Sequence, residues 1–463
     1  MNTIKKEIKQ VRELQTRFFG SNKTKEIEFR LRQLKRLKNA IKRYEDQLLT
    51  ALLIDLGKHY NEGYMTEIGY VYQSLDTAVK NLSTWAKAKV VKTPYYMKLG
   101  KSYVVPEPYG RVLIIGPFNY PVQLVIEPLI GAIAAGNCAV VKLSELTPNV
   151  SAVLEKMISD IFPRKYIWCL SGGVIETTAL LEERFDYLFF TGSQRVGKIV
   201  MQAAAKNMTP LTLELGGKSP VIIDETANLS LAAQQVVWGK TLNAGQTCVA
   251  PDYIYIHESV KERFLKLVDK ACVKQYGKAI LQSPYYSKII NDIHFNRLIQ
   301  IIQKEQDRIL LGGNYTKQER KIEFTVIDAK NGTQPCMQEE LFGPILPMIT
   351  YTDLNMVIEE INRKPKPLAL YLFSRNIRTQ QRLIEHTSSG GVCINDVISH
   401  LVNPNLPFGG VGDSGFGAYH GKESFLRFSH KKSIYHNRCN ISNLIAKPPY
   451  TRMQLWLVRR IMH

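Results

Sequence analysis

The sequence lacks the features that mark several broad classes of protein. Its seven cysteines are widely spaced, odd in number and never form a Cys-x-x-Cys pair. This argues against a disulfide framework and a structural zinc site, and it favours a reducing compartment. No histidine spacing indicates a metal site, and no repeat or low-complexity tract is present. A hydrophobic content of 45% excludes disorder, collagen and coiled coil as descriptions of the whole chain.

The sequence also lacks a hydrophobic run that predicts a membrane span. The most apolar stretch, residues 112–141, contains Glu127 and several helix-breaking residues. These divide the stretch into pieces the size of single strands and helices. The N-terminus has no apolar signal core either, so we expect a cytoplasmic protein. The breaking residues are Gly116, Pro117, Pro121, Pro128 and Gly136.

Acidic residues are scarce at both ends of the chain, whose formal net charge is +20. Residues 1–43 hold 14 Lys and Arg against 4 acids, and residues 424–463 hold 8 Lys and Arg and no acid. The long middle of the chain is therefore close to neutral. A nucleic-acid enzyme more often carries basic residues in its working groove. We expect no nucleic-acid partner, and the basic residues near the N-terminus are better explained as solvated helix faces.

Short apolar strands alternate with helices in two series, after an N-terminal segment with the spacing of amphipathic helices. A chain of 463 residues is also too long for one hydrophobic core. Fully apolar strands that alternate with helices are typical of parallel, doubly wound sheets. The fold class is therefore α/β, with two such domains. The expected strands are 112–115, 138–142, 167–170 and 187–190, then 221–223, 253–256, 345–350 and 368–373.

Two short motifs contain groups suited to covalent catalysis. Cys248 lies in a loop of small and polar residues, residues 243–251, which suits the access that a thiolate nucleophile needs. Glu214 lies between two leucines directly before two glycines. Partial burial there raises a carboxyl pKa toward the range of a general base. Taken alone, each motif also fits a structural role, as a buried small thiol or as a carboxylate that binds backbone N–H groups.

Together these motifs resemble the two signature motifs of the aldehyde dehydrogenase superfamily. They read Thr-Leu-Glu-Leu-Gly-Gly-Lys-Ser-Pro from Thr212 and Asn-Ala-Gly-Gln-Thr-Cys-Val-Ala-Pro from Asn243. The resemblance extends over about residues 27–433, and residues 388–391 and 414–421 are similar to the class 3 branch, which includes fatty and aromatic aldehyde dehydrogenases. Further motifs in the family's order are Pro117–Pro121, Gly131–Asn137, Phe190–Ser193, Gln338–Pro344 and Leu406–Gly412.

The resemblance implies a role for each of three catalytic residues. Cys248 corresponds to the nucleophile that attacks the aldehyde carbon and forms a thiohemiacetal. Asn119 corresponds to the side-chain donor that stabilises the oxyanion together with the Cys248 N–H group. Hydride transfer then leaves a thioester, and Glu214 corresponds to the base that activates water to hydrolyse it. The implied product is the carboxylic acid of a hydrophobic aliphatic or aromatic aldehyde.

The resemblance also implies an NAD site, with NADP possible. Glu145 corresponds to a residue that binds ribose hydroxyls, and its charge disfavours a 2′-phosphate. Leu143 departs from the usual Lys-Pro-Ser-Glu, so the local backbone is expected to differ slightly. His420 is a candidate for the substrate entrance, although a lone histidine is more often a structural residue. The cofactor residues are Lys142 and Glu145, then Gly192, Ser193 and Gly197, then Glu340 and Phe342.

The family fold implies the domain boundaries and a homodimer. Residues 1–91 and 109–213 are expected to form the NAD(P)-binding domain, and residues 214–413 the catalytic domain. Residues 92–108 and 414–437 are expected to bridge the subunits. Residues 438–463 are a basic tail, whose last part has the pattern of an interfacial helix. We expect this helix to dock on its own dimer near the substrate entrance; the alternative is peripheral contact with a membrane.

Other functions are weighed against the same residues. A CoA-acylating dehydrogenase would need no water-activating carboxylate, so Glu214 argues against it. A catalytically silent family member should lack Cys248 or Glu214, and both are present. A basic nucleic-acid protein is disfavoured by the neutral middle of the chain.

Overall fold

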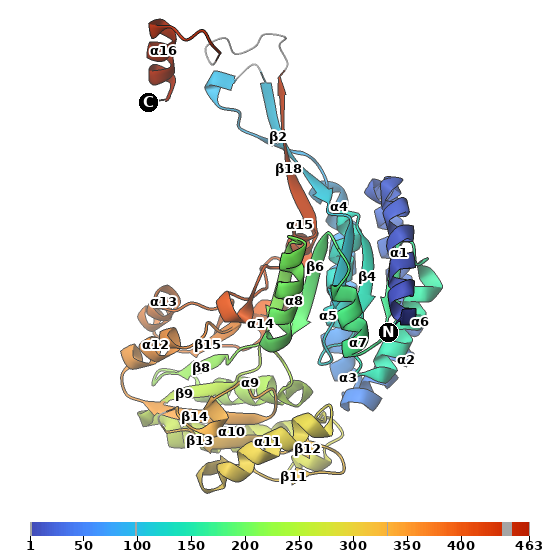
Figure 1. Cartoon of the computed structure of the whole chain (residues 1–463). Coiled ribbons are helices and arrows are strands. Elements are labelled where there is room, and N and C mark those ends of the chain that lie inside the picture. Colours follow the sequence, from blue (N-terminus) through green and yellow to red (C-terminus); the bar gives the residue numbers. More distant parts are fainter. Residues whose placement is uncertain (1, 98–99, 331, 438–446, 463) are drawn as a thin grey trace.

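The computed structural model describes residues 2–97, 100–330, 332–437 and 447–462. It contains two large sheets with their helices and a narrow arm that extends away from both (Figure 1). Cys439 and residues 438–446, the first part of the predicted tail, lie outside the described residues. The predicted α/β class is confirmed, because both large sheets are mainly parallel and are covered by helices.

The first large sheet has six strands, in the order β17-β7-β6-β3-β4-β5. All neighbours are parallel except β17, which pairs antiparallel with β7. The four strands predicted in the first series are all present, and two of them have the predicted bounds. Their side chains are buried, as expected for strands covered on both faces. The strands are β3 (Arg111–Ile115), β4 (Cys138–Lys142), β5 (Ile167–Leu170), β6 (Tyr187–Gly192), β7 (Leu211–Leu215) and β17 (Gly415–Phe416).

Helices cover both faces of this sheet because alternate side chains of each strand point to opposite faces. Leu113 and Ile115 of β3 pack with α1, α7 and α8, whereas Val112 and Ile114 pack with helices of the other face. The predicted N-terminal amphipathic helices are confirmed as α1 and α2. The helices are α1 (Asn2–Gly20), α2 (Ile27–Leu56), α4 (Gly69–Trp85), α5 (Gln123–Ala135), α6 (Pro148–Ile161), α7 (Val174–Leu181), α8 (Gln194–Lys206) and α15 (Gly421–Arg427).

The strand order reverses between β3 and β6. From β3 the chain continues outward to β4 and β5, then returns to form β6 on the other side of β3. In open parallel sheets, such a reversal separates the loops at the carboxyl ends of the two strands and opens a crevice between them. The turn after β3 and the residues after β6 therefore lie on either side of one crevice.

The second large sheet has seven strands, in the order β10-β13-β14-β9-β8-β15-β16, and only β10 is antiparallel to its neighbour. The second predicted series is confirmed, whereas β10, β13 and β16 were not predicted. The strands are β8 (Pro220–Ile223), β9 (Tyr253–His257), β10 (Ile309–Leu311), β13 (Thr325–Asp328), β14 (Ile345–Tyr351), β15 (Ala369–Phe373) and β16 (Gly391–Ile394). The helices of this half are α9 (Leu229–Thr241), α10 (Lys261–Tyr276), α11 (Asp292–Lys304), α12 (Leu354–Arg363), α13 (Ile377–His386) and α14 (Ser399–Val402).

The arm is a three-stranded antiparallel sheet of β1 (Lys89–Val91), β2 (Gly100–Pro108) and β18 (Ser429–Asn437). It differs in extent from the predicted bridging pieces, because β1 precedes residue 92. Within residues 414–437, β17 pairs with β7, and α15 packs on α5. The predicted boundary at 214 also falls inside β7.

The C-terminal helix α16 (Arg452–Met462) lies at the tip of this arm (Figure 1). None of its residues is buried. It contacts the arm through a hydrogen bond from Tyr95 Oη to the Ile461 carbonyl at 2.8 Å. Among the described residues, no helix combines the length and apolarity needed to cross a membrane.

Candidate active site

A cavity of about 1250 Å³ includes the crevice beside the ends of β3 and β6. It is lined by residues of both halves of the molecule. All the residues predicted for catalysis and cofactor binding line it except Gly197. Gly197 lies one turn into α8, where an added Cβ would meet the side chain of Leu215 at 2.7 Å. A glycine at this position is explained by the close packing of α8 on β7. The predicted residues that line the cavity are Asn119, Lys142, Glu145, Gly192, Ser193, Glu214, Cys248, Glu340 and Phe342.

Cys248 lies in a buried loop between α9 and β9. The loop begins with Asn243 and Ala244, whose φ angles of 50° and 51° place both residues in the left-handed region. Cys248 itself is partly exposed and lines the cavity. Burial raises the pKa of its thiol to about 12, and the charges of Glu340 and Glu214 act in the same direction. The N–H groups of Cys248 and Val249 face the sulfur and lower this pKa, but burial outweighs them.

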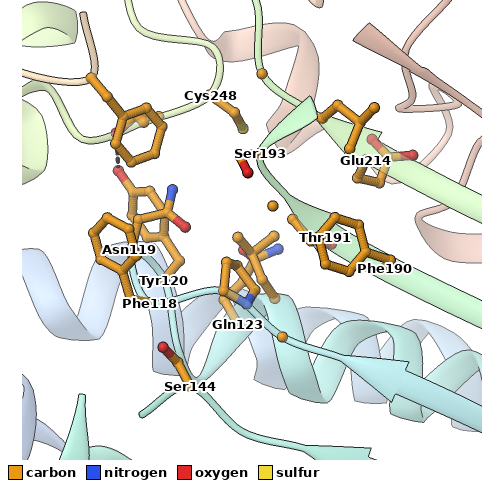
Figure 2. A pocket seen from close by; sticks show the side chains of 18 of the residues that line it. Phe118, Asn119, Tyr120, Gln123, Ser144, Phe190, Thr191, Ser193, Glu214 and Cys248 are labelled. Atoms are coloured by element: carbon orange, nitrogen blue, oxygen red, sulfur yellow. Dashed lines mark hydrogen bonds between the residues drawn. The ribbon is translucent and has the colours of Figure 1, made fainter. Parts of the chain in front are cut away.

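Asn119 lies in the turn that follows β3. Its side-chain Nδ2 donates to the Gln246 carbonyl at 3.1 Å, so it contacts the loop of Cys248 directly. The next residue strengthens this connection, because Tyr120 Oη and Thr247 Oγ1 are 2.6 Å apart. Figure 2 shows Asn119 and Glu214 on either side of Cys248. The amide of Asn119 carries a second hydrogen, which is available to an oxyanion.

Glu214 lies on β7, between β6 and β17, where its backbone pairs with Thr191 and Gly415. It is buried, and neither carboxyl oxygen has a hydrogen-bond partner among the described residues. Burial therefore raises the pKa of Glu214 well above its usual value, and only the charge of Arg427 opposes this. The predicted desolvation is confirmed. A buried carboxyl with no protein partner next to a cavity is suited to binding a water molecule.

Glu340 packs against the two glycines that follow Glu214. A Cβ at Gly216 would overlap the Glu340 carboxyl, and the Gly217 N–H donates to it. This close approach explains why glycine follows the strand here. Burial and the charge of Asp252 raise the pKa of Glu340 to about 8. Phe342 is nearby, with its ring 5.8 Å from that of Phe118.

Lys142 and Glu145 form an ion pair of 3.0 Å at the end of β4. The lysine is buried and the glutamate is half exposed, so its carboxylate is accessible from the cavity. Between them, the N–H of Leu143 donates to the Leu170 carbonyl at 2.9 Å. A proline could not make this bond. The departure from Lys-Pro-Ser-Glu thus extends the hydrogen bonding between β4 and β5.

Of the two roles considered for His420, the structure favours the structural one over the substrate entrance. His420 is buried and does not line the cavity. Its ring stacks on Phe408 with centroids 5.1 Å apart, and its Nδ1 lies 3.1 Å from Tyr70 Oη. Burial lowers its pKa to about 3. The cavity wall is formed instead by the residues in front of it, Tyr70, Phe408 and Tyr419.

Three charged residues beside the site were not predicted, and two of them, Lys58 and Glu67, are buried. Lys58, Glu62 and Glu67 lie between α2 and α4, and they contact the turn of Asn119 or the loop of Cys248. No local pattern distinguishes them from the many charged residues of the N-terminal segment. A Lys and a Glu nine positions apart indicate nothing without the fold.

The fold and this arrangement of thiol, amide and buried carboxyl define a class of enzyme that comparison with known proteins identifies. Residues 3–434 match the family described as "Aldehyde dehydrogenase family", so the chain belongs to this family and is an aldehyde dehydrogenase.

Within the family, the chain is similar to class 3 enzymes and to a bacterial enzyme. It is 52% identical over 433 residues to the 4,4'-diaponeurosporen-aldehyde dehydrogenase of Staphylococcus aureus, covering 94% of each chain. It is 43% identical to the dimeric NADP-preferring aldehyde dehydrogenase of Rattus norvegicus, again over 94% of each chain. A solved structure, "Substrate bound state of Staphylococcus Aureus AldH", has a TM-score of 0.96 at 50% identity, covering 98% of this chain and 99% of that chain. The predicted class 3 resemblance is confirmed.

Proposed function

We propose that the enzyme oxidises a hydrophobic aliphatic or aromatic aldehyde to its carboxylic acid with NAD(P). The observation that supports this most strongly is one cavity lined by Asn119, Cys248 and Glu214. These residues come from three separate elements of both sheets. Each has an environment suited to its role: an accessible thiol, an amide donor beside it, and a buried carboxyl without a protein partner.

The residues perform the reaction in two stages. The Cys248 thiolate attacks the aldehyde carbon, and the Asn119 amide donates to the resulting oxyanion of the thiohemiacetal. The bound cofactor supplies the acceptor for the hydride that this carbon then loses, which leaves a thioester. Glu214 takes a proton from water, the hydroxide attacks the thioester carbon, and the Cys248 thiolate leaves. The acid is released. This use of Glu214 disfavours transfer of the acyl group to CoA.

The cavity also contains groups suited to NAD(P). Ser193 caps α8, a helix whose N-terminus favours an anion such as the cofactor diphosphate. Lys142 and Glu145 would bind ribose hydroxyls, and Glu340 with Phe342 would hold the nicotinamide ribose. We propose that NAD is preferred because the Glu145 charge repels a 2′-phosphate. The rat relative is named NADP-preferring, so titration of binding with both NADH and NADPH decides the preference.

The substrate end of the cavity is apolar, which supports a hydrophobic aldehyde. Trp238, Leu242 and Phe408 are among its lining residues, and apolar pockets bind apolar groups by removing them from water. The Staphylococcus aureus relative is named for a 4,4'-diaponeurosporen-aldehyde. A panel of aldehydes of increasing chain length, assayed with NAD and with NADP, identifies the preferred class.

Replacement of the nucleophile tests the mechanism. Cys248→Ala should abolish NADH formation with every aldehyde, because no thiohemiacetal can form. The matched control is Cys272→Ala, since Cys272 is also a free, partly exposed cysteine and does not line the cavity. The control should keep wild-type turnover. Turnover retained by Cys248→Ala would refute the mechanism.

We also propose that two chains associate through the arm. Val90, Tyr95 and Tyr96 expose large apolar side chains there, and such exposure is typical of surfaces that another chain covers. The exposed helix α16, at the tip of the same arm, would dock on the partner subunit near its substrate entrance. Peripheral membrane contact is the alternative, and it would keep the enzyme at a cytoplasmic membrane surface.

A further inference from the structure

Lys58 is a buried lysine directly behind the turn that carries Asn119. Its side chain is completely buried. Its Nζ lies 2.6 Å from Glu67 Oε1, and it donates to the backbone carbonyl of Asn119 at 2.8 Å. The same ammonium group lies 3.8 Å from the centre of the Tyr120 ring. Among the residues that the structure describes, the backbone carbonyl of Asn119 is thus the one carbonyl to which Lys58 donates.

Glu67 holds the other end of the same turn. Its side chain is also completely buried. Its second oxygen, Oε2, accepts hydrogen bonds from the N–H groups of Val122 and Gln123 at 2.8 Å and 3.1 Å. These groups are at the start of α5, where helix N–H groups have no partner within the helix. The ion pair therefore binds the turn at both ends. Lys58 binds the Asn119 carbonyl, and Glu67 binds the first N–H groups of α5.

The same short segment also supports the loop of the nucleophile. Asn243 Nδ2 donates to the Asn119 carbonyl at 2.9 Å, and the Asn243 N–H donates to Glu62 Oε1 at 2.9 Å. The Asn119 carbonyl thus receives two hydrogen bonds, one from Lys58 and one from the loop that leads to Cys248. The position of the amide donor relative to the thiol depends on both bonds.

We propose that Lys58 and Glu67 are positioning residues for catalysis, which set the location of the Asn119 side-chain amide at the oxyanion. The inference rests on the proposed function of Asn119. A buried ion pair is costly to desolvate, and apolar replacement of both partners is often neutral for stability. The role of the ion pair here is to fix the position of the turn. An error of about 1 Å in the place of a catalytic group can reduce the rate about 100-fold, so loss of the pair should slow acylation while the fold persists.

A double-mutant cycle tests whether the pair acts through Asn119. The first variant is Lys58→Met with Glu67→Leu, which removes both charges together and leaves neither buried alone. The second is Asn119→Ala, and the third combines all three changes. The rate of the first NADH burst measures acylation in each, and quenching of NADH fluorescence measures cofactor affinity. The control is Lys38→Met with Asp76→Leu, a surface ion pair between α2 and α4.

We expect Asn119→Ala to slow acylation by about 100- to 1000-fold, the usual effect of losing an oxyanion donor. The Lys58→Met, Glu67→Leu variant should slow it by about 10- to 100-fold with unchanged NADH affinity. The combined variant should be no more than about threefold slower than Asn119→Ala, because residues that act through one another are not additive. The surface control should leave the burst unchanged.

Each other outcome identifies what is wrong. Effects that multiply in the combined variant, or an unaltered burst in the Lys58→Met, Glu67→Leu variant, would overturn the positioning role alone. An unaltered burst in Asn119→Ala would overturn both this role and the oxyanion assignment, and turnover by Cys248→Ala would refute the proposed function itself. If the double replacement does not fold, Glu67→Asp is used instead. It keeps the charge but shortens the side chain by one methylene. It should slow the burst at unchanged NADH affinity, and a wild-type burst would refute the proposal.

Discussion

At the scale of single residues, the site contains two acids whose charged forms burial disfavours. The Cys248 thiol and the Glu214 carboxyl both have raised pKa values, and desolvation is the main cause for each. A thiol is a nucleophile only as the thiolate, and a carboxyl is a base only when ionised. Burial thus makes both stages of the proposed reaction depend on proton removal within the cavity.

Glu214→Gln should separate the two stages. Glutamine has a similar shape but cannot accept a proton from water, so acylation should proceed and deacylation should slow by about 100-fold or more. Intact mass spectrometry after mixing with aldehyde and NAD should show the acyl-enzyme. Glu339→Gln is a matched control, because Glu339 is exposed at the edge of the cavity and pairs with Arg297. Unaltered turnover in Glu214→Gln would remove Glu214 from the role of base.

The acylation rate should rise with pH. Because burial raises the pKa of Cys248 to about 12, the thiolate fraction increases about tenfold with each unit by which the pH rises, as long as the pH stays below that value. The amplitude-normalised NADH burst should therefore increase steadily from about pH 6.5 to about pH 9. A burst rate that is already constant below pH 7 would contradict this, and would mean that substrate or cofactor binding stabilises the thiolate.

At the scale of elements, helix α16 is an amphipathic helix with no buried residue. Three arginines, Arg452, Arg459 and Arg460, accompany exposed Leu455 and Trp456. Such a pattern fits an interface, either with protein or with anionic lipid. The two alternatives differ in what removes Trp456 from water.

Flotation with anionic liposomes distinguishes these alternatives. If α16 docks on the partner subunit, the full chain and a chain that ends at Asn440 should float equally little. The emission that is lost in Trp456→Phe should then be that of an indole already shielded from water in the absence of lipid. Adding vesicles should not shift this emission. Stronger flotation of the full chain, with a blue shift of Trp456 on adding vesicles, would instead establish membrane contact.

At the scale of the whole molecule, the net charge of +20 belongs to the ends of the chain. The first basic segment forms α1 and α2, where several charges face solvent or form surface pairs such as Arg12 with Glu183. The described part of the second basic segment includes the end of α15, β18 of the arm and α16. Among the described residues, no basic residue of either end lines the cavity, although the charge of Arg427 acts on Glu214.

The enzyme should sediment as a dimer, and this should depend on the arm. Val90→Glu places a charge on an exposed apolar residue of β1, which we expect the partner to cover, so it should shift the sedimentation coefficient toward that of a monomer. Met208→Glu is the control, because Met208 is also exposed but lies outside the arm. A wild-type coefficient for Val90→Glu would remove β1 from the interface, and a monomeric wild type would refute the dimer.

Local patterns were sufficient for many elements and for two of the groups proposed to react. The strands 138–142 and 167–170 were predicted with their observed bounds, because apolar runs between turn residues indicate strands covered on both faces. Cys248 and Glu214 were found because their neighbours form recognisable motifs. By contrast, β17 was missed, since its two residues gain strand character only by pairing with β7.

The sequence by itself therefore determined the kind of elements, the class of chemistry and the distribution of charge, because periodicity and side-chain chemistry are local properties. The tertiary structure decided which distant groups meet and how deeply they are buried. Lys58 and Glu67 flank the turn of Asn119 only after the fold brings them there. Their energetics, like the raised pKa values of Cys248 and Glu214, depend on exclusion of water, which only the packing of segments far apart in the chain produces.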